Sequence, residues 1–344
     1  MLYNKAMENE TKQNQNVFDR RKFYNDGDSG KIFLFALLLP ILISFIFTLI
    51  QNIIVGASGI EGDSITNNIW FNTAYGLVTA ISYVLLYVLY NKINKIEYKA
   101  INLNFKMKWH TYLLVIAIGV VSLFGVQYFI TCVDNFLKLI GFPLQISSPD
   151  MGESLTNPQS FGIFALSVIV TAVIPAISEE LLFRGVILNG LRTRFNDYAS
   201  IFISAALFAL MHQNLQQLVY PFILGSIMAW IVLRTGSLVS SMIVHFINNF
   251  LVILFTYLQN VTNFSMALPN EWWFYLVAIV LLAATFGIIY LVDRFYFKHK
   301  SKETVERSSV KTSKWIYISV GVALALFVFI TIFAFASAAA GWLK

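Results

Sequence analysis

Two adjacent carboxylates, Glu179 and Glu180, are the residues of this chain best suited to chemistry, because they stand at the end of an apolar run at 161–177. Among the 18 Asp and Glu residues, these two alone touch an apolar stretch of membrane-spanning length. Burying an ionisable group near hydrocarbon is costly, and such groups normally persist for a function. A carboxylate in a wet pocket can act as a general base that takes a proton from water.

Imidazole and amide side chains occur in the apolar stretches that follow. Two of the four histidines are there, His212 and His245, and Asn249 follows His245 by four residues. Residues four apart share a helix face, so His245 and Asn249 present an imidazole and an amide to the same cavity. Taken one at a time, these residues are also compatible with helix capping or with hydrogen bonds between helices.

Ideal helix geometry predicts where the carboxylates and His212 lie relative to one another. Glu179 and His212 are equally far from the turn at 194–197 between their spans. At the usual helical rise this distance is about 25 Å, so we expect both side chains at one depth, where they can share a water molecule. Glu180 and Arg184 lie four residues apart and can pair, whereas Glu179 points about 100° away. We therefore expect Glu180 to be structural and Glu179 to act as the base.

Pro175 lies four residues before Glu179 and is expected to disturb the same helix. Proline has no backbone N–H, so it frees a helical carbonyl and kinks or opens the helix. Such a distortion would admit water beside Glu179.

The composition requires a membrane protein. Hydrophobic residues make up 58% of the chain and charged residues only 12%, whereas soluble domains carry about 25% charged residues. Length and apolarity predict an all-α, polytopic membrane helical bundle of about nine transmembrane helices, with a four-helix catalytic core. The expected spans are 32–55, 69–90, 111–131, 161–180, 198–212, 218–233, 238–258, 272–292 and 315–337.

Basic residues set the orientation, since they concentrate on the cytoplasmic side of membrane proteins. With nine spans, all of the 24 Lys and Arg residues except Lys138 and Lys344 fall on one side. We therefore predict a cytoplasmic polar tail at 1–31, a transmembrane domain at 32–337 that contains the catalytic core at 155–258, and an external C-terminus. The net charge of +6 is explained by this bias and gives no reason to expect nucleic-acid binding.

Three short motifs on successive core helices resemble the CPBP family of intramembrane proteases, the CAAX proteases and bacteriocin-processing proteins that are also called the Abi family. The motifs are Glu-Glu-x-x-x-Arg at 179–184, Phe-x-x-x-His at 208–212 and His-x-x-x-Asn at 245–249. Each motif is weak by itself, but together and in order they are specific. The resemblance covers roughly residues 155–258 and does not extend to the flanking spans.

The resemblance implies an endopeptidase that cleaves a peptide bond within the membrane. Glu179 would be the general base that polarises a water molecule, and His212 would hold that water or a metal ion. His245 and Asn249 would stabilise the oxyanion of the tetrahedral intermediate. The candidate catalytic residues are Glu179, Glu180, Arg184, His212, His245 and Asn249.

A metal-dependent mechanism is the alternative at the same site. Glu179, His212 and His245 are a donor set that could bind zinc and leave an open position for water. The sequence contains no His-Glu-x-x-His motif. The residues alone therefore do not decide between a zinc enzyme and a glutamate-dependent enzyme without a metal.

Two other classes of function remain open. A non-catalytic immunity or scaffold protein could use this fold to bind a membrane-active peptide, and a proton-coupled transporter could use the acid and imidazoles as a relay. No inverted halves that would favour a transporter are visible. The expected partners are membrane lipid and a peptide or membrane-associated protein. The abundance of Asn, Lys, Ile and Phe indicates a bacterial plasma membrane, where relatives take part in bacteriocin immunity or peptide processing.

Overall fold

The computed structural model describes residues 23–59, 61–139, 153–213, 218–262, 272–297 and 311–339. In these ranges the secondary structure is helical, which confirms the all-α polytopic bundle. Seven helices are long and apolar enough to cross a membrane, and two shorter apolar helices lie between the fourth and fifth of them. The long helices are α2 (Asp26–Ser58), α4 (Ile69–Ile93), α5 (Trp109–Leu139), the composite helix Phe161–Arg192, α12 (Leu238–Val261), α13 (Trp272–Phe295) and α14 (Lys314–Ala339).

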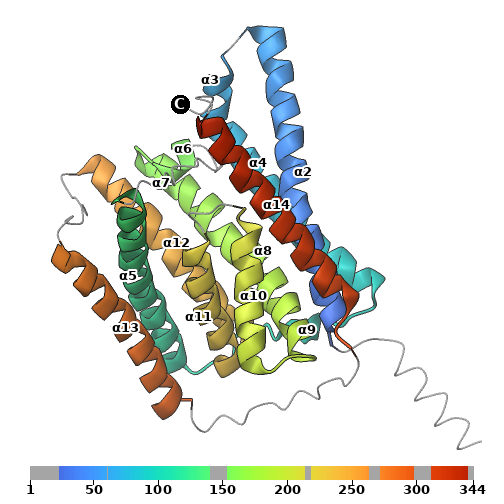
Figure 1. Cartoon of the computed structure of the whole chain (residues 1–344), viewed down its shortest axis with the longest axis vertical. Helices are drawn as coiled ribbons and strands as arrows, with labels where there is room; N and C mark the ends of the chain where they lie inside the picture. Colours follow the sequence, from blue (N-terminus) through green and yellow to red (C-terminus); the bar gives the residue numbers. More distant parts are fainter. Residues whose placement is uncertain are drawn as a thin grey trace, which may run out of the picture.

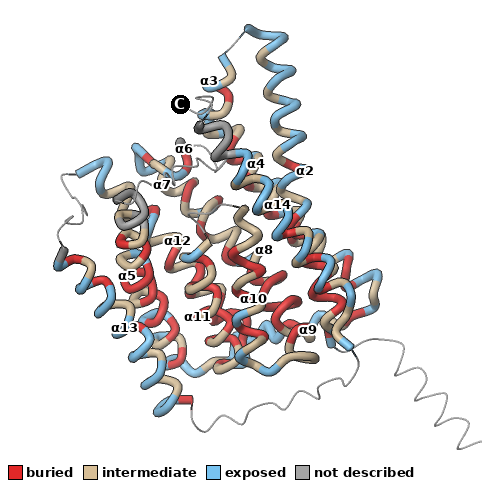
Figure 2. Tube along the Cα trace, in the orientation of Figure 1, coloured by how far each residue is buried: buried red, intermediate tan, exposed pale blue. Residues whose placement is uncertain are grey.

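The two shorter helices are α10 (Asp197–Met211) and α11 (Val219–Thr235), and together with the composite helix and α12 they form the expected four-helix core. Figure 1 shows the core in the middle of the bundle, with α5 and α13 on one side and α2, α4 and α14 on the other. Buried residues concentrate in the core and in α5, whereas α13, α14 and the far end of α2 are largely exposed (Figure 2). The short elements are α3 (Gly62–Thr66), η1 (Tyr98–Ile101) and α6 (Glu153–Thr156).

The composite helix is longer and less regular than the predicted span 161–180. It continues to Arg192 because no proline or polar turn follows Glu180. Two π-helical segments interrupt it, and such segments occur frequently at functional sites. Its parts are α7 (Phe161–Ser167), η2 (Val168–Val173, π-helical), α8 (Ile174–Glu180), η3 (Leu181–Ile187, π-helical) and α9 (Leu188–Arg192).

The first helix begins at Asp26, before the predicted boundary at 32. Asn25 caps it by accepting a hydrogen bond from the Asp28 N–H, and the Asp28 side chain accepts one from the Asn25 N–H. Asp28 is only 2% exposed, and the Tyr90 hydroxyl of α4 donates to its Oδ1 over 2.6 Å. The end of the predicted tail therefore belongs to the folded domain. Asp28 also shows that Glu179 and Glu180 are not the only carboxylates in apolar helices.

Candidate active site

Glu180 and Arg184 form the buried ion pair that their spacing predicts. Both side chains are fully buried, and Arg184 Nη1 lies 2.6 Å from Glu180 Oε1. Arg184 Nη2 donates to the Gly225 carbonyl of α11 over 3.1 Å. A Cβ atom on Gly225 would lie only 3.1 Å from that Nη2 atom, so the absence of a side chain lets the guanidinium approach the backbone. The pair thus ties the composite helix to α11.

His245 of α12 joins this pair through Glu180. Its Nδ1 atom lies 3.0 Å from Glu180 Oε1, and the residue is 5% exposed. An ionised carboxylate only accepts hydrogen bonds, so Nδ1 carries the proton and Nε2 is left for other partners. The expectation that Glu180 is merely charge-compensated is therefore incomplete, because Glu180 also orients the imidazole of His245.

His212 is oriented by a different acceptor. It is the residue that ends α10, and its Nδ1 atom lies 2.9 Å from the carbonyl oxygen of Phe208. A carbonyl can only accept, so Nδ1 carries the proton, and Nε2 of the neutral ring keeps its lone pair. His212 is thus prepared to accept a proton or a hydrogen bond from water.

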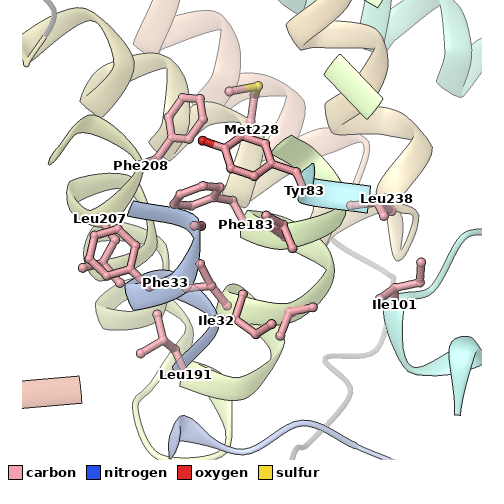
Figure 3. Close-up of a cluster of buried hydrophobic side chains, with 14 of the residues drawn as sticks. Ile32, Phe33, Tyr83, Ile101, Phe183, Leu191, Leu207, Phe208, Met228 and Leu238 are labelled. Carbon is pink, nitrogen blue, oxygen red and sulfur yellow. The ribbon is translucent and has the colours of Figure 1, made fainter. Parts of the chain in front are cut away.

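The ring of Phe208 lies among the polar side chains of the site. Its centroid is 5.0 Å from that of His212, 6.0 Å from that of His245 and 4.4 Å from the Arg184 guanidinium carbon. Figure 3 shows the Phe208 ring beside Phe183. Phe208 therefore contacts both imidazoles and the arginine through one aromatic ring.

Asn249 of α12 contacts the backbone of the composite helix near Pro175. Its Nδ2 atom donates to the Thr171 carbonyl in η2 over 2.9 Å. Thr171 precedes Pro175 by four residues, and proline offers this carbonyl no N–H. Asn249 supplies a donor from α12 instead. Its neighbour Asn248 accepts a hydrogen bond from the Tyr220 hydroxyl, and its amide nitrogen lies within hydrogen-bonding distance of backbone carbonyls.

Glu179 is half-buried and, unlike Glu180, has no hydrogen bond to its carboxylate from the parts of the chain that the structure describes. Its charge interacts with Arg184 and with Tyr83 of α4. The Tyr83 hydroxyl contacts the Met211 sulfur over 3.5 Å, next to His212. In Figure 3 this hydroxyl points toward Phe208. Sequence reasoning missed Tyr83, because nothing distinguishes it from the other three tyrosines of the predicted span 69–90.

The predicted zinc ligands do not form a metal site in this structure. Within the described ranges, no three His, Cys, Asp or Glu side chains are grouped so that they could hold a metal ion. Glu180, which does contact His245, is already neutralised by Arg184. Zinc binding by Glu179, His212 and His245 stays a prediction from the sequence, and the present geometry does not fit it.

Comparison with known protein families gives a match for the core of the chain. Residues 161–251 match the family described as Rce1-like, type II CAAX prenyl endopeptidase Rce1-like. The matched segment runs from the start of the composite helix into α12 and contains all three motifs, so it confirms the predicted family resemblance for the catalytic core. No curated protein and no solved structure matches the chain. The chain is therefore an integral membrane protein whose residues 161–251 are similar to this family.

Proposed function

We propose that this protein is an intramembrane endopeptidase in which Glu179 and His212 activate a water molecule. The observation that carries the proposal is the fixed orientation of the two imidazoles around Phe208. Both Nδ1 atoms are engaged, His212 with a carbonyl and His245 with Glu180, so both Nε2 atoms are available to a substrate or to water. Glu179 supplies a carboxylate with no hydrogen-bond partner among the described residues.

The first step is the attack of water on the peptide carbonyl. The water donates one hydrogen bond to the Glu179 carboxylate and one to Nε2 of His212, which increases the electron density on its oxygen. Glu179 takes the proton as the oxygen bonds to the carbonyl carbon. The product is a tetrahedral intermediate whose former carbonyl oxygen is negatively charged.

His245 is suited to stabilise this oxyanion. The Glu180 carboxylate 3.0 Å from Nδ1 orients the ring, and Nε2 donates to the oxyanion when it carries a proton. Asn249 uses one amide hydrogen for Thr171 and keeps a second for the intermediate. Glu179 then returns its proton to the departing amine, the C–N bond breaks, and the carboxylate is regenerated.

The substrate proposed for this site is a peptide or membrane-associated protein that enters from the cytoplasmic side. His245 lies seven residues after the start of α12, which is about 11 Å along the helix from its cytoplasmic end in the predicted orientation. A role in bacteriocin immunity or peptide processing in a bacterial plasma membrane is the biological setting that we propose.

Cleavage by purified variants tests the proposal. We expect Glu179→Gln and His212→Ala each to lower kcat for a membrane-anchored peptide by about 10²–10⁴-fold, the usual contribution of a general base. Glu61→Gln removes an exposed carboxylate outside the core and is the matched control. Unchanged cleavage by both core variants would refute the assignment. Metal analysis of the same samples decides whether zinc takes part.

A further inference from the structure

A cavity of about 310 Å³ lies outside the catalytic site, where α9, α10, α11 and α13 end or begin. These ends are at the bottom of the bundle in Figure 1, on the predicted cytoplasmic side. The lining contains both polar and apolar side chains. Arg192, Arg234 and Asn102 supply polar groups, while Ile201 and Trp230 are among the apolar residues.

The cavity offers guanidinium donors, although each of its two arginines is paired with an aspartate. Two arginines, Arg192 and Arg234, line it together with one carboxylate, Asp197. Arg192 is largely buried and uses only Nε to contact Asp197, over 3.2 Å. Its two terminal nitrogens have no hydrogen-bond partner among the described residues. Arg234 is held in place by Asp293, which is not part of the lining. A buried guanidinium with free donors is suited to bind a phosphate group.

The apolar part of the lining indicates that this phosphate belongs to an amphiphile. Ile201 and Trp230 lie on α10 and α11, which run from the cavity into the membrane. Tyr198 also lines the cavity and is 67% exposed, so the cavity is accessible at the level where headgroups lie. Basic pockets between membrane helices on the cytoplasmic side bind anionic lipids in this way. We propose that the cavity binds the phosphate-bearing headgroup of an anionic membrane lipid.

The bound headgroup would connect the two helices that carry the catalytic side chains. Arg192 is the last residue of the composite helix that contains Glu179. Arg234 is the last residue but one of α11, which a turn at 236–237 joins to α12, the helix that contains His245. A phosphate between the two arginines would hold these helix ends together. This consequence for activity depends on the proposed endopeptidase function, but headgroup binding itself does not.

Lipid retention by the purified protein is the direct test. The protein is prepared in phosphatidylcholine nanodiscs with or without phosphatidylglycerol, and bound lipid is counted by native mass spectrometry while thermal unfolding is followed in parallel. We expect wild type to retain phosphatidylglycerol and to melt at a higher temperature with it. Arg192→Gln should reduce retention at least fivefold. Arg294→Gln, an equal charge loss at an exposed residue of α13 outside the cavity lining, should not.

A second variant and a soluble probe complete the test. Leu233→Trp fills part of the cavity without changing its charge and should also reduce retention, which guards against misfolding of Arg192→Gln as the cause. Equal retention by wild type and both cavity variants would overturn the proposal, as would equal losses in Arg192→Gln and Arg294→Gln. Displacement of the lipid by millimolar inorganic phosphate, with the same rise in melting temperature, would show a soluble phosphate site and would also overturn it.

Discussion

The core helix α12 and the flanking helices α13 and α14 are all apolar enough to cross a membrane, yet they differ in what they bury. In the most apolar window of each helix, 44% of α12 is buried, against 11% of α13 and 17% of α14. By mean hydropathy α12 is the least apolar of the three. Apolar side chains can face lipid as well as protein, so hydropathy does not show which helix is buried. Polar residues such as His245 and Asn248 do indicate that α12 lies inside the bundle.

The same comparison separates regular from irregular helices. Two π-helical segments lie in the composite helix of the core, whereas α13 and the described part of α14 are α-helical throughout. Buried ion pairs and side-chain donors such as Asn249 stabilise the irregular helix. The flanking helices instead expose large apolar residues, for example Val280 at 64%. Substitutions of one type should therefore have different effects in the two regions.

The largest difference is expected for arginine. Arg184→Met leaves the Glu180 carboxylate buried with His245 as its remaining partner, and breaking a buried pair in this way costs about 3–5 kcal/mol of the free energy of unfolding. Arg294→Met on α13 removes an exposed charge and should change that free energy by less than about 0.5 kcal/mol. Thermal or denaturant unfolding in detergent measures both. If both substitutions changed the free energy of unfolding by similarly small amounts, the core and the flanking helices would not differ in this respect.

A smaller difference is expected for glycine. A Cβ atom on Gly190 would collide with the Ser29 hydroxyl and with the Asn25 carbonyl of the α2 start, whereas one on Gly287 of α13 meets nothing within 4 Å. Overpacking of this kind costs about 1–3 kcal/mol, so Gly190→Ala should destabilise the protein. Gly287→Ala should be neutral or stabilising by up to about 1 kcal/mol, because alanine favours helix. A destabilised Gly287→Ala would show that α13 packs more closely than its exposure indicates.

The smallest effect on stability is expected for Asn249, and it distinguishes a structural role from a catalytic one. Asn249→Ala removes the hydrogen bond to Thr171 and should cost about 0.5–1.5 kcal/mol of the free energy of unfolding. Pro175→Ala in the same chain supplies a backbone N–H near that carbonyl and should recover part of this cost. A double-mutant cycle on stability and on peptide cleavage measures both roles. If cleavage recovers together with stability, Asn249 is a structural tie and not a donor to the oxyanion.

Much of the helix arrangement could be predicted from the sequence, because the apolar runs are long and proline or polar residues separate them. The ends of the helices are harder to predict from the sequence. The start at Asp26 depends on a cap by Asn25 within a polar segment. Hydropathy ends the fourth span at 180, although the helix continues to Arg192, close to the turn expected at 194–197. The π-helical segments were not predicted, since they depend on contacts with other helices.

The candidate site was predicted where its contacts are local. Glu180 and Arg184 are four residues apart, and helix geometry alone brings them together. The contact of Glu180 with His245 spans 65 residues, and that of Thr171 with Asn249 spans 78. Such contacts depend on how the helices rotate about their axes when they pack, and apolar periodicity is too weak in buried helices to define that rotation.

The short lengths of α10 and α11 have a consequence for the surrounding bilayer. Their 15 and 17 residues extend about 22 and 26 Å, less than the roughly 30 Å thickness of the hydrocarbon layer. Phe202 of α10 is 52% exposed, so this side of the core meets lipid tails directly. Local thinning of the membrane is one way in which a bilayer accommodates such short helices. The acyl chain length of the host membrane therefore acts on α10, the helix that bears His212 and Phe208.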